Sequence, residues 1–263
     1  SRRPDEETLS AVLAGRAHSD TEMGNGSTVL IVRSVPLRTP DEHIGALVLL
    51  RDVTDLRSRD RELVTKDATI REIHHRVKNN LQTVAALLRM QSRRISSPEA
   101  KVALNDAMSR VAAIAIVHET LSQTFDETVE FDRVADGLLR MVGDVSSTSA
   151  GVSARRCGSF GVVSADLATS LSMVVTELCQ NALEHGLADQ AGEVLVVPGR
   201  ADGRLRVEIS DDGRGLPADF DWRQSRSLGL SIVNTLIEEM EGTFEIGPRP
   251  GARGTQAVLE IPV

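Results

Sequence analysis

The chain has 263 residues, enough for two domains and part of a third. Its formal net charge of -8 argues against a polyanion as the partner of the whole chain. Only 2% of the residues are aromatic, which argues against an aromatic stacking platform for single-stranded nucleic acid and leaves the core to Leu, Val, Ile and Ala. We therefore expect no direct contact with nucleic acid.

The sequence favours a cytoplasmic protein. Cys157 and Cys179 are far apart and neither belongs to a C-x-x-C pair, as is usual in a reducing compartment. No apolar run approaches the length that spans a bilayer, and no signal peptide is recognisable, so we expect no membrane segment in this chain. Because the chain opens on "SRRPDEE" without Met, a fragment whose missing part holds an anchor is also consistent with the sequence.

Residues 1–55 are expected to form strands and turns. The runs "STVLIVRSVPL" and "HIGALVLLRDVTD" are apolar and rich in Val, and "MGNGS" before them is a turn signal. Two strands do not make a stable domain alone, so this region is predicted to be the C-terminal half of a larger one.

Residues 56–125 are expected to form a helical hairpin. "SSPEA" supplies a turn, an N-cap and a first-turn proline between two helices, so the helices are predicted to be antiparallel. A lone hairpin leaves an apolar face over, and two hairpins that pair into a four-helix bundle bury it, so we predict a homodimer. Apolar seam positions recur mostly every three, four or seven residues at Leu56, Leu63, Ile70, Ile73, Val77, Leu81, Val84, Leu88, Gln91 and Ile95.

Residues 126–263 alternate helices and strands without a strict strand–helix–strand repeat. The long helix in "SADLATSLSMVVTELCQNALEHG" has Ser164 as its expected N-cap and Gly186 as its end. The runs "EVLVV", "RLRVEIS", "TFEI" and "AVLEI" are expected to be strands. We predict an α/β sandwich with a mixed sheet, and hence an α+β multidomain chain.

Two adjacent histidines stand in "EIHHRVKNNLQ". On a helix, His74 borders the apolar seam while the neighbours of His75 are all polar, so His75 is predicted to face water. A neutral imidazole is a nucleophile near pH 7, and Glu72 could fix its tautomer. The alternatives are that His75 is a solvated helix residue and that His74 is a packing residue. A zinc site is not expected, because adjacent helix residues point about 100° apart.

Four polar segments follow in the third region. Glu177, Asn181 and His185 form a polar stripe, and a carboxylate and a carboxamide one turn apart suit a cation such as Mg²⁺. Asp211 ends a strand, where it can accept a hydrogen bond from an exocyclic amine. Backbone amides at a glycine-containing helix start form an anion site. The third and fourth segments are "SLGLSIV", which runs from Ser227 to Val233, and "ARGTQAVLEI", which carries Gly254-Thr255.

In this order and at these distances, the four segments resemble the nucleotide boxes of the Bergerat ATPase fold, which histidine kinases share with gyrase-type enzymes. "EIHHRVKNNLQ" resembles the phosphoacceptor box of the second HisKA family, as found in cytosolic actinobacterial sensor kinases. The resemblance covers about residues 57–263. It implies ATP and Mg²⁺ as cofactors, autophosphorylation of His75 and transfer to an aspartate of a response-regulator receiver. It also suggests an RNA-binding antiterminator as the regulator's output.

The resemblance assigns roles to individual residues. Asn181 would ligate Mg²⁺, Glu177 would polarise or help deprotonate at the reaction centre, and Asp211 would hold the adenine amino group. Asn79 stands four residues after His75, where related kinases carry Thr or Asn. The remaining nucleotide-binding candidates are His185, Gly213, Gly215, Ser227, Leu228, Gly229, Leu230 and Thr255.

The sequence departs from the family at three positions and in its lid segment. Ser227 replaces a glycine in the second glycine box, and Glu184 stands where many kinases carry a basic residue. Arg76 follows the histidine where an acid is common, so the general base is open between Glu72, a residue of the ATPase domain and none. The only lid candidate is the short "DFDWRQSRS", with Phe220.

The N-terminal strands and their exit helix, "GALVLLRDVTDLRSRDREL", resemble the end of a PAS sensor domain. The predicted domains are therefore a partial PAS domain at 1–55, a dimerisation and phosphotransfer hairpin at 56–125, and a catalytic domain at 126–263. An unrelated strand pair is the alternative for the first. For the whole chain, the alternatives are an ATPase of the same superfamily that phosphorylates no histidine and a scaffold without activity.

Overall fold

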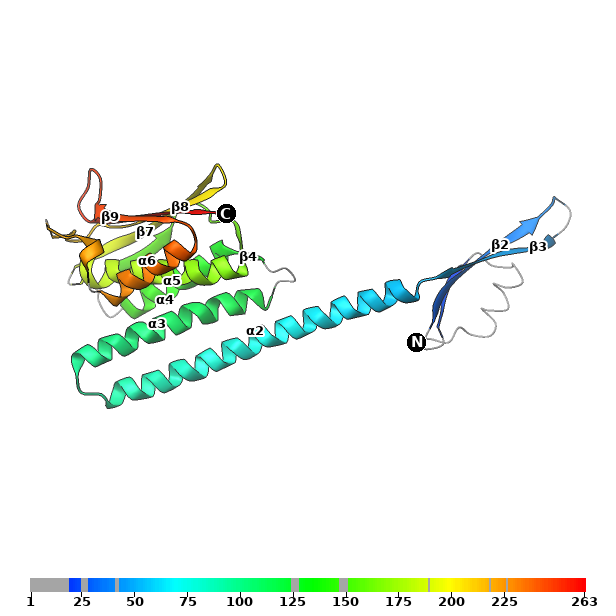
Figure 1. The fold of residues 1–263 in the computed structure, drawn as a ribbon, viewed down its shortest axis with the longest axis horizontal. Helices are drawn as coiled ribbons and strands as arrows, with labels where there is room; N and C mark the ends of the chain where they lie inside the picture. Colours follow the sequence, from blue (N-terminus) through cyan, green and yellow to red (C-terminus); the bar gives the residue numbers. More distant parts are fainter. Residues whose placement is uncertain are drawn as a thin grey trace. The chain divides into compact units, whose positions relative to one another are not determined.

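The computed structural model describes residues 19–24, 28–40, 43–123, 128–146, 151–188, 190–217, 219–225 and 227–263. The chain divides into two compact units, Ser1–Thr69 and Ile70–Val263. Helix α2 (Thr54–Arg94) begins in the first unit and ends in the second (Figure 1). The predicted turn "MGNGS" and the predicted boundary between residues 125 and 126 lie at least partly outside the described residues.

The first unit contains an antiparallel sheet in the order β1-β2-β3. The two expected strands are present as β2 (Val29–Arg38) and β3 (His43–Asp52), but the sequence did not predict β1 (Ser19–Gly24), which pairs with β2. Strand β1 is short and polar, so it lacks the alternation of apolar residues that identifies a strand. Its pairing with β2 adds a third strand, and a sheet needs at least three strands to be stable on its own.

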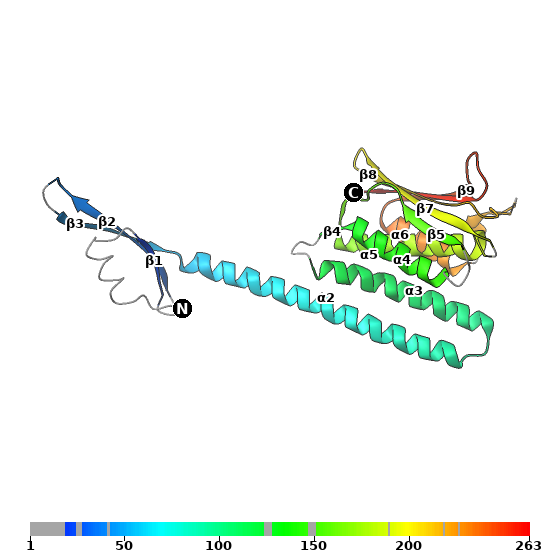
Figure 2. The same ribbon diagram turned by 180° about the vertical axis from the view of Figure 1, so that it is seen from behind.

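The second unit opens with the predicted hairpin. Helix α3 (Pro98–Leu121) starts at the predicted cap, since Ser97 Oγ accepts a hydrogen bond from the Ala100 amide and proline occupies the first turn. Near the far end of the hairpin, His74 Nδ1 lies 2.9 Å from His118 Nδ1. Figure 2 shows the hairpin from behind. None of the helices in the described part of the chain combines the length and apolar character that a membrane crossing requires.

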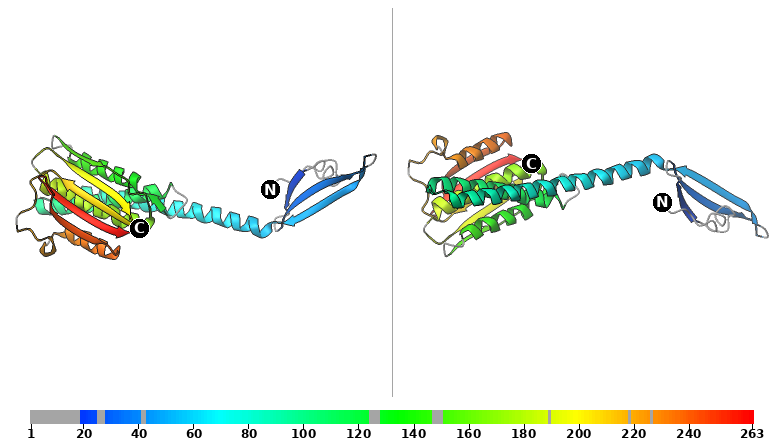
Figure 3. Two further views of the ribbon diagram at one scale, coloured as in Figure 1. Left: turned by 90° about the horizontal axis from the view of Figure 1, so that it is seen from above. Right: turned by 90° about the horizontal axis from the view of Figure 1, so that it is seen from below.

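The rest of the second unit is a layer of helices on a five-stranded sheet in the order β5-β7-β8-β10-β9. The predicted mixed sheet is confirmed, because β5 runs parallel to β7 while the other neighbours are antiparallel. Figure 3 shows the helices on one face of this sheet. The strands are β5 (Val152–Arg156), β7 (Gly192–Ala201), β8 (Arg204–Asp211), β9 (Thr243–Pro248) and β10 (Thr255–Pro262), and a small ribbon pairs β4 (Thr128–Glu130) with β6 (Val162–Ser164).

The helical layer consists of α4 (Phe131–Ser146), α5 (Ala165–Asn181) and α6 (Leu228–Glu239). Ser164 caps α5 as predicted, with its Oγ accepting from the Leu167 amide. A single π-helical turn, η1 (Ala182–Gly186), extends α5, and a 3-10 turn, η2 (Trp222–Gln224), precedes α6.

Helix α3 belongs to the core of the catalytic unit as well as to the hairpin. Its residues Ala113, Val117 and Leu121 are buried in the same apolar cluster as Leu171 of α5. Figures 1 and 2 both show α3 between α2 and the layer of α4 and α5. In this structure the hairpin is therefore docked on the catalytic unit through α3.

Candidate active site

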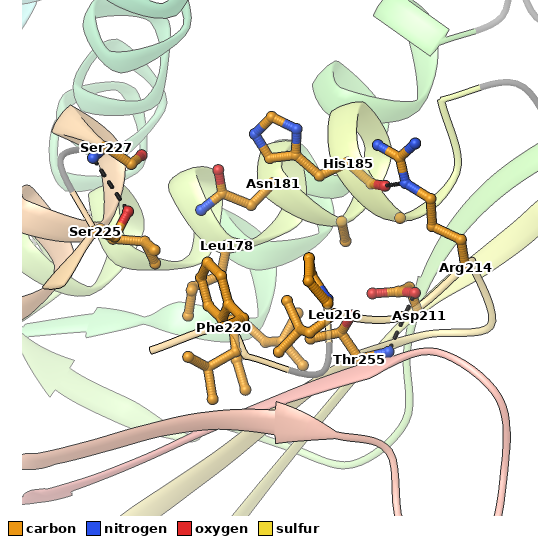
Figure 4. A pocket seen from close by; sticks show the side chains of 18 residues that line it. Leu178, Asn181, His185, Asp211, Arg214, Leu216, Phe220, Ser225, Ser227 and Thr255 are labelled. Carbon is orange, nitrogen blue, oxygen red and sulfur yellow. Dashed lines mark hydrogen bonds between the residues drawn. The ribbon is translucent and has the colours of Figure 1, made fainter. Parts of the chain in front are cut away.

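A cavity of about 620 Å³ lies between the end of α5, the C-terminal end of β8 and the start of α6. This is within the range of about 300–1,000 Å³ typical of small-molecule sites. In Figure 4, Asn181 and His185 lie on the helical side of the cavity, and Asp211 and Thr255 lie together at another side. Residues of all four predicted polar segments therefore line this cavity.

Asp211 is held rigidly at the floor of this cavity. The residue is 3% exposed, and Oδ1 accepts hydrogen bonds from the amides of Gly213 (2.8 Å) and Thr255 (3.3 Å). Both fixed bonds use the same oxygen. Oδ2 is therefore the atom available to accept a bond from a ligand amine, which fits the role that the sequence suggested for this residue.

Three glycines bring backbone close to Asp211. A Cβ on Gly186 would lie 2.8 Å from the Asp211 carboxyl carbon, and one on Gly254 would lie 2.0 Å from the Asp211 carbonyl oxygen. A Cβ on Gly213 would lie 2.2 Å from the Gly186 carbonyl oxygen. The chain can close around the carboxylate only because these positions lack a side chain. Sequence analysis predicted Gly213 as a binding residue and pointed to Gly254, but it predicted Gly186 only as the end of the helix.

Asn181 is the last residue of α5 before the π-helical turn. Its Nδ2 is the only buried side-chain nitrogen or oxygen in the described residues that has no hydrogen-bond partner. A buried unpaired donor costs free energy, so this amide is left available to bind a polar group of a ligand. The wide turn η1 shifts His185 away from a regular helical position, and the His185 carbonyl oxygen accepts a bond of 2.5 Å from Arg214 Nε.

Helix α6 presents free amides at one side of the cavity. Ser227 occupies the N-cap position without a side-chain hydrogen bond to the helix, so the first-turn amides lack a capping side chain. Uncapped amides and the positive end of a 12-residue helix attract anions. Ser227 and Leu230 line the cavity, as does Gly215, whereas the side chain of Leu228 is exposed. For Leu228, only its backbone is suited to the predicted role.

Glu177 does not line the cavity but lies directly beside it. A Cβ on Gly229 would come within 2.7 Å of Glu177 Oε2, so the glycine allows the α6 start to touch the carboxylate. Both carboxylate oxygens accept bonds from Arg110 of α3, at 2.5 Å and 3.0 Å. Sequence reasoning missed Arg110, because nothing in the pattern of α3 shows that it packs against α5.

Sequence reasoning also missed the apolar walls of the cavity. They consist largely of residues that look like ordinary core positions in sequence, and of the five given below only Phe220 was assigned to the site, as part of a lid candidate. The surrounding side chains are Leu178, Leu216, Phe220, Ile246 and Ala257. Apolar walls beside a fixed carboxylate suit an apolar heterocycle that carries an amine.

The two histidines of α2 differ as predicted. His75 is exposed, whereas His74 is half-buried and bonded to His118 of α3. Burial lowers the pKa of both His74 and His118. Glu72, the residue suggested for tautomer control, instead accepts bonds from Arg76 at 3.0 Å and 2.5 Å. This pair is solvent-exposed and therefore weak.

The side chains at the cavity fit a cation that is held mainly by the phosphates of a bound ligand and by few protein atoms. No group of three or more His, Cys, Asp or Glu side chains in the described residues could hold a metal. Mg²⁺ is commonly held by one or two protein oxygens together with phosphates and water. The Asn181 carboxamide, which has an unpaired nitrogen, offers one such oxygen at the cavity.

Comparison with known proteins agrees with these features. The HisKA_2 family, a histidine kinase family, matches residues 72–146, and the histidine kinase-, DNA gyrase B- and HSP90-like ATPase family matches residues 166–263. Sensor histidine kinase PdtaS of Mycolicibacterium smegmatis is 46% identical over 254 residues, which are 95% of this chain and 51% of that protein. PdtaS of Mycobacterium tuberculosis is 47% identical over 246 residues, 92% of this chain and 49% of that protein.

The chain spans about half the length of these curated relatives. Among solved structures, the histidine kinase domain of a blue-light-activated histidine kinase from Erythrobacter litoralis has a TM-score of 0.56 at 24% identity, covering 78% of this chain and 94% of that one. This likeness concerns the fold. By its two domains and its relatives, the chain belongs to the sensor histidine kinases that join a HisKA_2 helical segment to a histidine kinase-, DNA gyrase B- and HSP90-like ATPase domain.

Proposed function

We propose that the chain autophosphorylates on His75 with ATP and then transfers the phosphoryl group to an aspartate of a response-regulator receiver. The observation that carries the proposal is the combination, in one unit, of an exposed histidine on a helical hairpin and a cavity with a fixed carboxylate and an unpaired amide. The domains proposed for this task are a partial PAS domain at 1–55, the hairpin at 56–125 and the catalytic domain at 126–263.

Different residues of the cavity bind different parts of the nucleotide. Asp211 Oδ2 accepts a hydrogen bond from the adenine amino group, and Thr255 and Gly215 line the adenine end of the cavity. The first-turn amides of α6 face the phosphates, beside Ser227 and Gly229. Asn181 would hold Mg²⁺, which would neutralise charge on the phosphates, and His185 also lines the cavity.

In the chemical step, a ring nitrogen of His75 attacks the γ-phosphorus of ATP. We assign Nε2, the nitrogen farther from the backbone. A nitrogen–phosphorus bond forms, the bond from the γ-phosphorus to the β–γ bridging oxygen breaks, and ADP leaves. Phosphoryl transfer requires mainly positioning and charge neutralisation, so a strong base is not essential. Glu72, Glu177 or no residue at all is the base, and Asn79 lies one turn from His75 on α2.

The partners follow from the same proposal. A receiver domain docks on the hairpin, and the relatives' family suggests a regulator with an RNA-binding antiterminator output. Two chains pair through α2, whose residues Ile73 and Leu87 are 52% and 53% exposed. The protein acts in the cytoplasm.

Labelled ATP tests the proposal. Incubation of the protein with γ-labelled ATP should yield acid-labile, base-stable label, as expected for phosphohistidine. His75→Gln should abolish the label while nucleotide binding in a calorimetric titration persists, and His74→Gln should retain it. If His74→Gln abolishes the label and His75→Gln does not, the assignment is wrong. Steady ATP turnover without any phosphoprotein would contradict the kinase proposal.

A further inference from the structure

The ion pair between Arg110 and Glu177 connects the hairpin to the catalytic unit. The Glu177 side chain is 4% exposed and that of Arg110 is 17% exposed, so the pair is largely shielded from water. The two bonds use both carboxylate oxygens and two guanidinium nitrogens in a fork. The hydrogen bond to Glu177 raises the pKa of Arg110. While the pair exists, both oxygens of Glu177 are engaged by Arg110.

The pair also fixes the catalytic unit at a particular level of the hairpin. His118 of α3 bonds to His74 of α2, so His118 marks the level of the neighbouring His75. Arg110 is eight residues before His118 on the same helix, a separation of about 12 Å along its axis. Reacting atoms must approach to about 3–3.5 Å. Glu177 is therefore held about two helical turns away from the level of the acceptor.

Helix α3 itself adds to this separation. Figures 1 and 2 show α3 between α2, which carries His75, and α5, which carries Glu177. The docked face of α3 is buried in the catalytic core at Ala113 and Val117. In this docked arrangement α3 therefore separates the helix that carries the acceptor from the helix that carries Glu177.

From this geometry we propose that the Arg110–Glu177 ion pair is an autoinhibitory contact, which holds the catalytic unit on α3 and keeps Glu177 from the reaction centre until the contact opens. The inference rests on the proposed function, since it concerns the access of the nucleotide to His75. The opened state, with Glu177 released, is the one competent for phosphoryl transfer.

The surroundings explain why the contact depends on Arg110. Asp106 of α3 and Glu184 of η1 lie close enough to interact with Glu177 or with each other, and burial raises the pKa of both. Arg110 offsets the negative charge at this interface, with His185 as the other basic group. Without Arg110, the docked state would bury Glu177 without a counter-charge beside two further acids. Loss of the guanidinium should therefore open the interface.

Arg110→Gln is the direct test. We expect the initial rate of autophosphorylation to rise about tenfold, as it would if the open arrangement were populated at about 10% in the unaltered protein. The ATP dissociation constant should change by less than about twofold, because Arg110 does not line the cavity. Lys101→Gln removes an exposed positive charge from the same helix and should leave the rate unchanged.

A rate at or below that of the unaltered protein, with nucleotide binding intact, would overturn the proposal. If Arg110→Gln binds no nucleotide, Arg110→Lys decides instead, since it keeps the charge but loses the fork. A gain in rate for Arg110→Lys supports the contact, and no gain overturns it.

Amide hydrogen exchange separates this inference from the proposed function. In Arg110→Gln, amides of α3 around Ala113 should exchange faster than in the unaltered protein, whether or not a phosphohistidine forms. Unchanged exchange would overturn the docking contact even if the kinase reaction is confirmed. Absence of phosphohistidine in the unaltered protein, with faster exchange in the variant, would overturn only the kinase proposal.

Discussion

At the scale of single residues, Asp211 combines a structural task with recognition. One carboxylate oxygen accepts hydrogen bonds from the Gly213 amide, in the turn after β8, and from the Thr255 amide, at the start of β10. These two bonds hold the turn and the strand together. The other oxygen is left for a ligand. Because the fixed bonds determine how the carboxylate is oriented, recognition by the second oxygen is preorganised and requires little ordering on binding.

Asp211→Asn tests this division of labour. The amide replaces an acceptor by a donor that would face the donor amine of adenine, and a hydrogen bond to a charged group contributes about 1.5–3 kcal/mol. We expect ATP to bind roughly 10- to 150-fold more weakly in a calorimetric titration. Asp212→Asn is the control, because Asp212 bonds to the Glu193 amide and does not line the cavity. Equal affinity of Asp211→Asn and the unaltered protein would contradict the assignment.

The His74–His118 contact predicts a pH dependence of the hairpin. Burial lowers the pKa of both imidazoles, and the neighbouring charges on the two helices are those of His75, Lys78 and Glu119. The folded hairpin therefore binds a proton more weakly than the unfolded chain, whose histidines titrate near pH 6.5, about the usual value. The contact contributes its full stability above that pH and loses it as the pH falls through the lowered values.

Urea unfolding followed by the circular dichroism of the helices measures this effect. The urea concentration at the unfolding midpoint should decrease when the pH is lowered from 7.5 to 5.5. Part of that decrease should be absent in His118→Gln, because glutamine cannot be protonated. His75→Gln is the matched control for the loss of an exposed imidazole from α2, and it should retain most of the decrease. A pH dependence that is identical in all three proteins would show that the buried pair does not titrate in this range.

At the scale of elements, the loop that leads into β10 determines the shape of the floor of the cavity. Gly254 has φ +112, a left-handed conformation, and a Cβ there would lie 2.0 Å from the carbonyl oxygen of Asp211. Gly251 in the same loop has φ +67, but a Cβ there would meet nothing within 4 Å. The two glycines thus separate the cost of the backbone conformation from the cost of a close approach.

Alanine at each position should reveal the difference. Gly251→Ala should lower the free energy of unfolding by about 1 kcal/mol, the cost of a left-handed alanine. Gly254→Ala adds a clash with backbone that cannot move aside, and should cost about 2–5 kcal/mol and weaken ATP binding. Chemical unfolding followed by the fluorescence of Trp222, the only tryptophan in the chain, reports on this domain. Equal losses in the two variants would rule out the close approach as the cause.

Much of the element order was accessible from sequence because it depends on local signals. Ser97 and Ser164 are side-chain caps with a clear pattern, and the apolar periodicity of the hairpin and of α5 predicted the helices. The π-helical turn η1 was not predicted, because "ALEHG" differs little from an ordinary helix end. Strand β1 was missed because its pairing with β2 is a tertiary contact rather than a pattern.

The same distinction applies to the site. Asp211 and Thr255 were found because polar residues beside glycines stand out between apolar runs, and Asn181 because it belongs to a polar stripe on an otherwise apolar helix. Arg110 was not found, since its partner Glu177 is 67 residues away and their contact depends on how α3 packs on α5. Long-range contacts between surface-like residues leave no periodic trace, so the link between the hairpin and the catalytic unit required the structure.

At the scale of the whole molecule, the hairpin has an apolar stripe left uncovered in the described chain. Of the predicted seam positions of α2, Leu81 and Leu88 are half-buried, whereas Val84 is 43% exposed. Leu87, next to the seam, is 53% exposed. Ile70, Ile73 and Met90 continue the exposed stripe. A row of large apolar side chains along a helix indicates a missing partner helix, and a second copy of the hairpin would supply it by forming a four-helix bundle.

Val84→Glu with Leu87→Glu tests the predicted homodimer. Two carboxylates on the stripe would be buried without partners in a bundle but solvated in a monomer, so the variant should be a folded monomer in sedimentation equilibrium. Gln82→Glu adds charge at an exposed polar position of the same helix and should leave the protein dimeric. ATP binding should survive in both, because the whole cavity belongs to one chain. An unaltered protein that is monomeric at micromolar concentration, or a double variant that remains dimeric, would contradict pairing through this stripe.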